Sequence, residues 1–376
     1  MPGVARLRIA YVINSLEGGG AAAPVPAIIE VLRGAGAEVR LLALTPRDRR
    51  VLPAIEAGGI DWRVRAGGRD DHWAAWRWLE REVADYAPDL LWTSLTRATL
   101  LGQLVGARRK LPVVSWQHAA WLKPANRWLL RAMQRRSLLW VADSASVAAL
   151  TGERLRVEPE RLITWPIFAA DPAAPIAVPW RPGEAVRLGS LGRLHPVKGF
   201  DVLVKALAVL PGGPPIDVVI AGEGDERPRL ETMTAASGFG NVRLAGFIDD
   251  PRQFLSGLHL YLQPSRSEGF CIAAHEAMQA GLPVVASSVG ELALSITRDV
   301  GRIVPPNDPA ALAAAISELI SHPERLATMG AAARAKILDR YSRERFTAAG
   351  CAVLERAVAL ARRRQPQPLP AIDRSV

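Results

Sequence analysis

The chain has 376 residues, of which 49% are apolar, and its formal net charge is +10. This length and apolar content allow two hydrophobic cores of ordinary domain size and exclude a disordered or fibrous protein. The basic balance indicates an anionic partner without identifying it. Only Cys271 and Cys351 are present, so no disulfide framework is predicted and a cytoplasmic location is expected. No apolar run is long enough to predict a membrane-spanning helix, and the apolar start of the chain resembles a strand rather than a signal peptide.

The first part of the chain alternates predicted strands and helices. Residues 7–13 and 39–44 have strand composition, and residues 21–32 have helix composition after the loop Gly18-Gly19-Gly20. This order opens a parallel α/β sheet. The glycines fit a weak dinucleotide-binding pattern, but no acidic residue follows the second strand to bind a ribose. The loop is therefore either a tight turn or a site for a phosphate or an acceptor.

A second group of strands is predicted at residues 90–92, 113–116 and 138–142, and residues 143–146 form a helix-capping cluster. His118 follows the middle one of these strands. Open α/β sheets bind their ligands at the carboxyl ends of strands, so His118 is a candidate ligand contact. The alternative is a histidine whose hydrogen bonds are satisfied inside the fold.

No acidic residue occurs between Asp89 and Asp143, and this segment carries arginines at a helical spacing. Arg127, Arg131 and Arg135 recur every four residues around Trp128. They form either a solvated cationic helix face or a surface for anionic phospholipid, with Trp128 and Trp121 as interfacial anchors. Three more tryptophans belong either to the same surface or to the core: Trp73, Trp76 and Trp78.

Four prolines in residues 169–184 are typical of a linker between domains. The second domain begins with a predicted strand at residues 186–191, and the loop from Gly192 to Gly199 carries Arg193 and Lys198. Two cations in a glycine-bounded loop between a strand and a helix indicate oxyanion binding, against the alternative of scattered surface charge. The loop is not a Walker A motif, because no Ser or Thr follows the lysine.

Further strands are predicted at residues 218–221, 242–248 and 258–262, and residues 298–341 have helix composition. After the strand at residues 258–262 comes a loop with Glu268, and then a predicted helix over residues 272–280 that carries Glu276. Eight helical residues rise roughly 12 Å, which exceeds the roughly 5 to 9.5 Å between the two carboxyls of a glycosidase. The pair therefore suits the two ends of an extended ligand. The alternative is an acid at a helix N-terminus and an unrelated surface glutamate.

The segment Glu268-Gly269-Phe270, the seven residues between the two glutamates and the following residues 277–286 resemble the donor-site signature of glycosyltransferase family 4. This resemblance implies the α/β GT-B fold, in which two Rossmann-like doubly wound domains face each other across a cleft, and sugar transfer that retains the anomeric configuration. It assigns the donor-sugar hydroxyls to Glu268, the ribose to Glu276, the diphosphate to Arg193 and Lys198, and a place near the reacting carbon to His118. Other donor-binding positions that it implies are Gly19, Gly20, Gly192, Phe247, Gly269, Phe270 and Cys271.

The resemblance also implies the domain plan. We expect an acceptor-binding domain at 1–168, the linker at 169–184, a nucleotide-sugar domain at 185–342, a helix at 343–361 that returns to the first domain, and a disordered tail at 362–376. Two segments depart from the family pattern. Three alanines follow the glycine loop where polar residues are common, and residues 163–168 lack the usual Asn-Gly pair.

The function predicted from the sequence is transfer of a sugar from a nucleoside diphosphate sugar to a lipid-linked, lipopolysaccharide or exopolysaccharide acceptor. A UDP-sugar is favoured and GDP-mannose is the alternative donor. No D-x-D occurs in the chain, so no metal or other cofactor is expected. The expected partners are the donor, the acceptor and the inner face of the plasma membrane as a peripheral contact, with no nucleic acid. The rival functions are an NAD(P)-dependent oxidoreductase and a degenerate family member that only binds sugar nucleotides.

Overall fold

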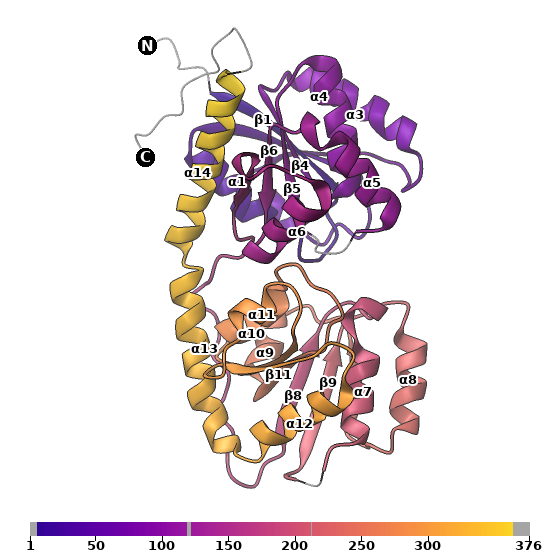
Figure 1. The fold of residues 1–376 in the computed structure, drawn as a ribbon, viewed down its shortest axis with the longest axis vertical. Helices are drawn as coiled ribbons and strands as arrows, with labels where there is room; N and C mark the ends of the chain where they lie inside the picture. The colour runs from indigo at the N-terminus through magenta and orange to yellow at the C-terminus, as the bar shows by residue number, and fades with distance from the viewer. Residues whose placement is uncertain (1–5, 119–121, 212, 364–376) are drawn as a thin grey trace. The chain divides into compact units, whose positions relative to one another are not determined.

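The computed structural model describes residues 6–118, 122–211 and 213–363. The chain divides into two compact units, and each has its own parallel sheet covered by helices (Figure 1). The first unit contains residues 1–167 and 344–376, and the second contains residues 168–343. Trp121 and residues 364–376 of the predicted tail lie outside the described residues.

The sheet of the first unit has seven parallel strands in the order β3-β2-β1-β4-β5-β6-β7. The strand order reverses direction between β1 and β4, which is where open α/β sheets form a ligand crevice at the carboxyl ends of their strands. The strands are β1 Leu7–Ser15, β2 Ala37–Thr45, β3 Asp61–Val64, β4 Leu90–Ser94, β5 Val113–Gln117, β6 Leu139–Ala142 and β7 Leu162–Thr164.

Helices cover both faces of this sheet. The helices are α1 Val25–Gly34, α2 Leu52–Ala57, α3 His72–Tyr86, α4 Thr96–Arg109, α5 Pro124–Met133, α6 Ala145–Leu155 and α14 Arg343–Arg362, with short 3-10 turns η1 Gln134–Arg136 and η2 Pro159–Arg161. From residue 344 onward, α14 belongs to this unit. A Cβ at Gly350 would lie 2.3 Å from the Trp165 ring and 2.6 Å from Val31, so glycine permits the close packing of α14.

The sheet of the second unit has six parallel strands in the order β10-β9-β8-β11-β12-β13. The strands are β8 Val186–Leu191, β9 Ile216–Ala221, β10 Val242–Gly246, β11 Leu260–Gln263, β12 Val284–Ser287 and β13 Gly301–Val304. The helices are α7 Phe200–Ala208, α8 Arg227–Ala236, α9 Pro251–Ser256, α10 Ile272–Gln279, α11 Leu292–Ser295, α12 Pro309–Ile320 and α13 Leu326–Arg340, with 3-10 turns η3 Pro196–Lys198 and η4 Pro323–Arg325. Here the order reverses between β8 and β11, so the loops after these two strands lie at the crevice.

Two sequence predictions about these elements are wrong. Residues 301–304, inside the stretch predicted to be helical, form β13, which pairs with β12. A Cβ at Gly301 would lie 2.0 Å from the Val284 carbonyl oxygen, a contact between distant residues that a local pattern does not encode. Helix α1 begins at Val25 and not at Ala21, because residues 20–24 form turns in which the amides of Ala22 and Ala23 both donate to the Gly19 carbonyl.

Within the described ranges, no helix has the length and apolar character needed to cross a membrane. The same residues contain no group of three or more His, Cys, Asp or Glu side chains arranged to hold a metal ion.

Candidate functional site

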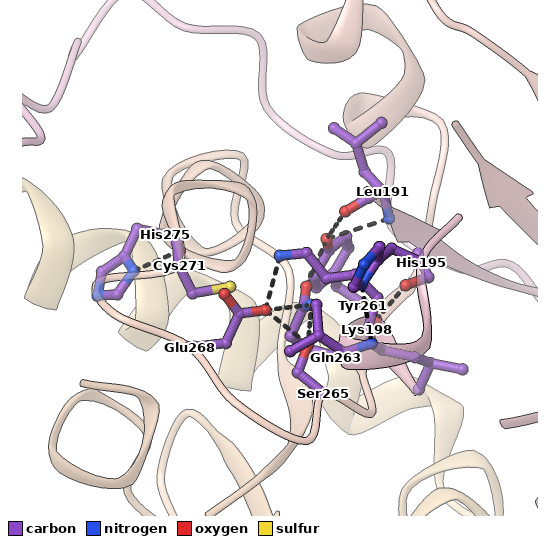
Figure 2. A network of polar contacts seen from close by, with 12 residues as sticks. Leu191, His195, Lys198, Tyr261, Gln263, Ser265, Glu268, Cys271 and His275 are labelled. Atoms are coloured by element: carbon purple, nitrogen blue, oxygen red, sulfur yellow. Dashed lines mark hydrogen bonds and ion pairs between the residues drawn. The ribbon is translucent and has the colours of Figure 1, made fainter. Parts of the chain in front are cut away.

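Two loops at the carboxyl edge of the second unit's sheet meet through an ion pair. The loop after β8 ends in η3 and carries Lys198, and the loop after β11 carries Glu268. The Lys198 ammonium lies 2.8 Å from Oε1 of Glu268 (Figure 2). The fold therefore brings together two candidate residues that are 70 positions apart in the sequence.

The same oxygen of Glu268 accepts two further hydrogen bonds. Ser265 donates its hydroxyl proton at 2.6 Å and Gln263 donates from its amide at 3.1 Å. Gln263 is in turn 3.0 Å from the Tyr261 hydroxyl, so a chain of buried polar groups leads from β11 to the carboxylate (Figure 2). Because Oε1 has three donors, the carboxylate is held in one orientation before any ligand binds.

Sequence reasoning missed the residues that orient Glu268. The available signal was a glutamine at the end of an otherwise apolar strand, Gln263, followed two residues later by Ser265. Buried polar groups need partners, so this pair of residues indicated a polar network just ahead of Glu268. The pattern did not show which group the network would hold.

The charge on Lys198 is stabilised by its partner. Burial alone would lower the pKa of Lys198, but the neighbouring Glu268 carboxylate outweighs burial and the pKa is raised. The ammonium is therefore charged at neutral pH although the side chain is only 23% exposed. Arg193, in the same loop, is exposed, and its guanidinium makes no hydrogen bond or ion pair with the described residues. The Arg193 guanidinium is therefore the cation of this loop that is accessible to an anionic ligand.

The loop that carries Arg193 lies on the backbone of the turn after β9. Gly222 and Gly224 have φ angles of 138° and 156°, and a Cβ would lie 1.9 Å from the Gly192 carbonyl oxygen and 2.2 Å from that of Leu194, respectively. The Leu194 amide also donates to the Glu223 carbonyl at 2.8 Å. Only glycine fits at these two positions, so the turn Gly222-Glu223-Gly224 supports the backbone of the loop that carries Arg193.

A second ion pair, in addition to that between Lys198 and Glu268, joins the same two loops. Arg266 forms a bidentate pair with the buried Asp201 of α7, with both N–O distances 2.8 Å. Its guanidinium also donates to the Pro196 carbonyl at 2.5 Å and to the Asn307 side chain at 2.6 Å, and its backbone amide donates to the Val197 carbonyl at 2.8 Å. We call this set of contacts the Arg266 clasp. It joins the loops after β8, β11 and β13.

The segment from Phe270 to Glu276 leads from the loop into α10. Phe270 is buried and stacks on His275 with ring centroids 4.0 Å apart, so its ring stabilises the start of the helix from inside. Cys271 has a φ of 67° and is buried, with its sulfur on the side of Glu268 (Figure 2). Burial raises the pKa of the Cys271 thiol, and the Glu268 carboxylate raises it further, so the thiol is protonated.

Glu276 differs from Glu268 in having no fixed partner. Its carboxylate makes no hydrogen bond or ion pair with the described residues, and burial raises the pKa of Glu276 to about 7. An unpaired carboxyl whose charged form is disfavoured is suited to a ligand that donates hydrogen bonds. Of the other positions predicted for the donor, Phe247 follows β10 and is 45% exposed, and Gly192 and Gly269 lie in the two loops already described.

The first unit holds the remaining candidates. His118 follows β5, and its Nδ1 lies 2.9 Å from Asp143 while its Nε2 lies 2.5 Å from the Ser94 hydroxyl. Gly19 and Gly20 are exposed in the turn after β1. Arg127 and Arg131 are exposed on α5 beside Trp128, which is 68% exposed, and Arg135 is exposed in η1.

Two family models match the chain: one matches most of the first unit and the other matches most of the second. The glycosyltransferase family 4 model matches residues 18–168, and the model for group 1 glycosyl transferases matches residues 179–336. Together they span the second sheet, every strand of the first sheet except β1, and the loops of the site described above.

Curated relatives with modest sequence identity to this chain are named as glycosyltransferases or mannosyltransferases. The lipopolysaccharide core biosynthesis mannosyltransferase LpcC of Rhizobium leguminosarum is 28% identical over 77% of this chain and 79% of its own length. A GDP-mannose-dependent phosphatidylinositol dimannoside mannosyltransferase of Mycobacterium tuberculosis is 37% identical over 42% of each chain. The lipopolysaccharide core biosynthesis glycosyltransferase LpsE of Rhizobium meliloti is 29% identical, and the match spans less than half of its length, 48%.

Solved structures share the fold over nearly the whole chain. Anabaena HepE, solved with UDP-glucose, superposes with a TM-score of 0.80 at 20% identity, covering 93% of this chain and 99% of HepE. Sucrose-phosphate synthase from Thermosynechococcus elongatus superposes with a TM-score of 0.76 at 20% identity, covering 94% of this chain and all of the other. The arrangement of two parallel sheets is therefore common to all three proteins.

Proposed function

The chain belongs to the group 1 (family 4) glycosyltransferases and has the GT-B fold, and from this premise we propose that it transfers a sugar from a nucleoside diphosphate sugar to a hydroxyl acceptor with retention at the anomeric carbon. The observation that carries the proposal is the contact of 2.8 Å between Lys198 and Glu268. It brings a cation suited to a diphosphate next to a carboxylate suited to sugar hydroxyls.

The chemical task is to stabilise negative charge on the departing nucleoside diphosphate. Preorganised cations in a site shielded from water are effective at this, because their electrostatic stabilisation requires no reorganisation during the reaction. Lys198 is held in place by Glu268, and Arg193 is exposed and unpaired among the described residues. We assign the diphosphate to these two cations, with backbone amide groups at the start of α10 as additional donors.

The two glutamates take different parts of the donor. Glu268 has one carboxylate oxygen saturated by three donors, so its other oxygen is the one available to a sugar hydroxyl. Glu276 has no hydrogen-bond or ion-pair partner among the described residues, and we assign it to accept hydrogen bonds from the ribose hydroxyls. His118 acts near the reacting carbon. No step is assigned to a metal ion, because the sequence has no D-x-D to bridge a metal and a diphosphate.

For the donor we favour a UDP-sugar, with GDP-mannose as the alternative. Anabaena HepE was solved with UDP-glucose, and the Mycobacterium tuberculosis relative is named for its dependence on GDP-mannose. For the acceptor we propose a lipid-linked or lipopolysaccharide-type saccharide, because two relatives are named for lipopolysaccharide core biosynthesis. Membership of this family favours sugar transfer over the oxidoreductase alternative.

We further propose a peripheral contact with anionic membrane through α5. Three features support it: the exposed Arg127 and Arg131, Trp128 at 68% exposure, and Leu129 at 37% exposure on the same short helix. Exposed cations beside exposed aromatic and aliphatic side chains suit an interface with acidic headgroups. This contact would bring the protein to a lipid-linked acceptor at the inner face of the plasma membrane.

The central test is release of nucleoside diphosphate from a panel of UDP- and GDP-sugars, with Lys198→Ala and the matched control Lys205→Ala, an exposed lysine of α7. We expect turnover of at least one donor and a loss of about a hundredfold or more in Lys198→Ala only. If no donor is turned over, or if the two variants are equally active, the proposal is wrong. Binding of a donor without turnover would identify a degenerate sugar-nucleotide binder, and binding of NADH in a tryptophan-fluorescence titration would favour the oxidoreductase.

The membrane contact has its own test. The double variant Arg127→Ala, Arg131→Ala should cosediment less with vesicles that contain anionic phospholipid, and added salt should reduce the difference from the unsubstituted protein. Arg63→Ala with Arg81→Ala, two exposed arginines of the same unit, is the matched control. Equal cosedimentation of both double variants would remove α5 from the proposal.

A further inference from the structure

Three polar side chains meet at the carboxyl edge of the first unit's sheet. Ser94 is the last residue of β4, His118 directly follows β5, and Asp143 directly follows β6. These three strands are neighbours in the sheet order, so residues about 25 positions apart in the sequence become adjacent. The family resemblance pointed to His118 alone.

The Asp143 carboxylate fixes one side of the imidazole. Nδ1 of His118 lies 2.9 Å from Oδ1 and 3.1 Å from Oδ2 of Asp143. The indole of Trp116 donates to Oδ1 of the same carboxylate at 2.5 Å, and its ring stacks on the imidazole with centroids 5.5 Å apart and planes 14° apart. An ionised carboxylate only accepts hydrogen bonds, so Nδ1 of His118 must carry a proton.

The Ser94 hydroxyl contacts the other side of the ring. Its oxygen lies 2.5 Å from Nε2 of His118, and the Ser94 side chain is fully buried. With Nδ1 protonated in the neutral ring, Nε2 is an acceptor and Ser94 donates to it. Both nitrogens are thus engaged, and the ring is restrained in its plane by hydrogen bonds and across its face by Trp116.

We propose that Asp143 and Ser94 are positioning residues that hold the His118 imidazole, in its Nδ1–H tautomer, for sugar transfer. The inference rests on the proposed function for the role of His118. The contacts have the order of a Ser-His-Asp hydrolase triad, but the Ser94 hydroxyl is fully buried and cannot reach a carbonyl carbon. The network therefore orients a group that touches the substrate and is not itself a nucleophilic centre.

The first experiment reads the tautomer directly. In a long-range proton–nitrogen correlation spectrum, His118 is identified among the 6 histidines by the signal that disappears in His118→Gln. We expect a protonated Nδ1 and an unprotonated Nε2 in the unsubstituted protein, and a shift toward the Nε2–H form in Asp143→Asn. A protonated Nε2 with a bare Nδ1 in the unsubstituted protein, or an unchanged pattern in Asp143→Asn, would overturn the inference.

The second experiment measures turnover and donor KM. Asp143→Asn should lower kcat by about tenfold to a hundredfold, the usual cost of a misplaced reacting group, with a smaller change in KM. In the double variant Asp143→Asn, His118→Gln, kcat should be no lower than in His118→Gln alone, because both substitutions remove the same function. Additive losses would overturn the proposal, since they would mean that Asp143 acts independently of His118.

Controls separate a positioning role from damage to the fold. Asp85→Asn, at an aspartate whose side chain is 77% exposed in the same unit, should keep kcat unchanged. If Asp143→Asn fails to fold, Ser94→Ala takes its place and should lower kcat while Nδ1 stays protonated; an unchanged kcat there would refute the role of Ser94. If the unsubstituted protein were inactive but gave the expected His118 nitrogen signals, the proposed function would be refuted. The orientation of the His118 ring by Asp143 would still be supported.

Discussion

The carboxyl edges of the two sheets differ in how their polar groups are fastened. In the second unit, the Lys198–Glu268 pair and the Arg266 clasp join three loops by charged hydrogen bonds of 2.5 to 2.8 Å. In the first unit, the ordered contacts gather around His118, while the glycine turn after β1 is exposed and a Cβ at Gly19 would have no heavy atom within 4 Å. The half proposed to hold the donor is built before binding, whereas the half proposed to meet the acceptor leaves its glycine turn open.

The difference has a physical reason. A diphosphate presents the same charges in every donor of this class, so fixed cations and fixed carboxylates serve all of them, and preorganisation lowers the cost of reaction. Acceptors vary in shape, and adaptable exposed loops allow such variation. Variants on the two edges should therefore behave differently.

The largest effect should come from Glu268→Ala. The substitution removes the partner of a mostly buried Lys198 and the contact proposed for the sugar hydroxyls, so turnover should fall by about a hundredfold or more. Glu231→Ala, at an exposed glutamate of α8, is the matched control. Turnover should be measured as release of nucleoside diphosphate, and comparable rates in the two variants would remove Glu268 from the site.

Gly224→Ala and Gly19→Ala compare the two edges at the backbone. A Cβ at Gly224 would lie 2.2 Å from the Leu194 carbonyl oxygen at a φ of 156°, so the free energy of unfolding should fall by about 2 kcal/mol or more. A Cβ at Gly19 meets no atom within 4 Å, so the free energy of unfolding should change by less than about 0.5 kcal/mol. Denaturant unfolding measures both, and equal losses would contradict the contrast between a prebuilt and an open edge.

Arg266→Met tests whether the clasp holds the two loops in place. Burial alone would raise the pKa of Asp201, but Arg266 outweighs burial and lowers the pKa, so the substitution leaves a buried carboxylate without its bidentate partner. We expect turnover to fall about tenfold through misplacement of Lys198 and Glu268. Arg229→Met, which removes the more distant partner of Asp201 at 3.7 Å, should cost less. An equal loss in the two variants would argue against a role for the clasp.

The smallest effect concerns the pH dependence of stability. Burial raises the pKa of Glu276 from 4.5 to about 7 in the folded chain, so the unfolded chain releases this proton at lower pH than the folded chain does. The contribution of Glu276 to stability is therefore complete below about pH 4.5, declines as pH rises toward 7, and is constant above that. In Glu276→Gln the decline in Tm across this range should be smaller by a few degrees than in the unsubstituted protein.

Thermal unfolding across this pH range, with Glu231→Gln as the control, measures the effect. Identical pH profiles for Glu276→Gln and the unsubstituted protein would show that Glu276 titrates normally. The same series with added UDP sharpens the comparison, because a ribose that donates to the carboxylate favours its charged form and should lower the pKa of Glu276.

Short-range patterns were sufficient for the parallel α/β organisation and for most strands. They were also sufficient to locate the cationic loop at 192–199, because its glycines, arginine and lysine lie within eight residues of one another in the sequence. Helix capping by Ser144 was correctly predicted, since its side chain accepts from the Val147 amide. The strand β13 was missed because its pairing with β12 is not encoded within its own four residues.

The sequence by itself determined the family, the two-sheet fold and the candidate residues Lys198, Glu268 and His118. Only the tertiary structure decided that Glu268 is oriented by Gln263 and Ser265, that Arg266 binds Asp201, and that Asp143 and Ser94 hold His118. The residues of a motif lie a few positions apart, so the sequence shows them directly. The partners of a buried charge depend on the order of the strands in the sheet, because this order brings together side chains that are up to 70 residues apart in the sequence.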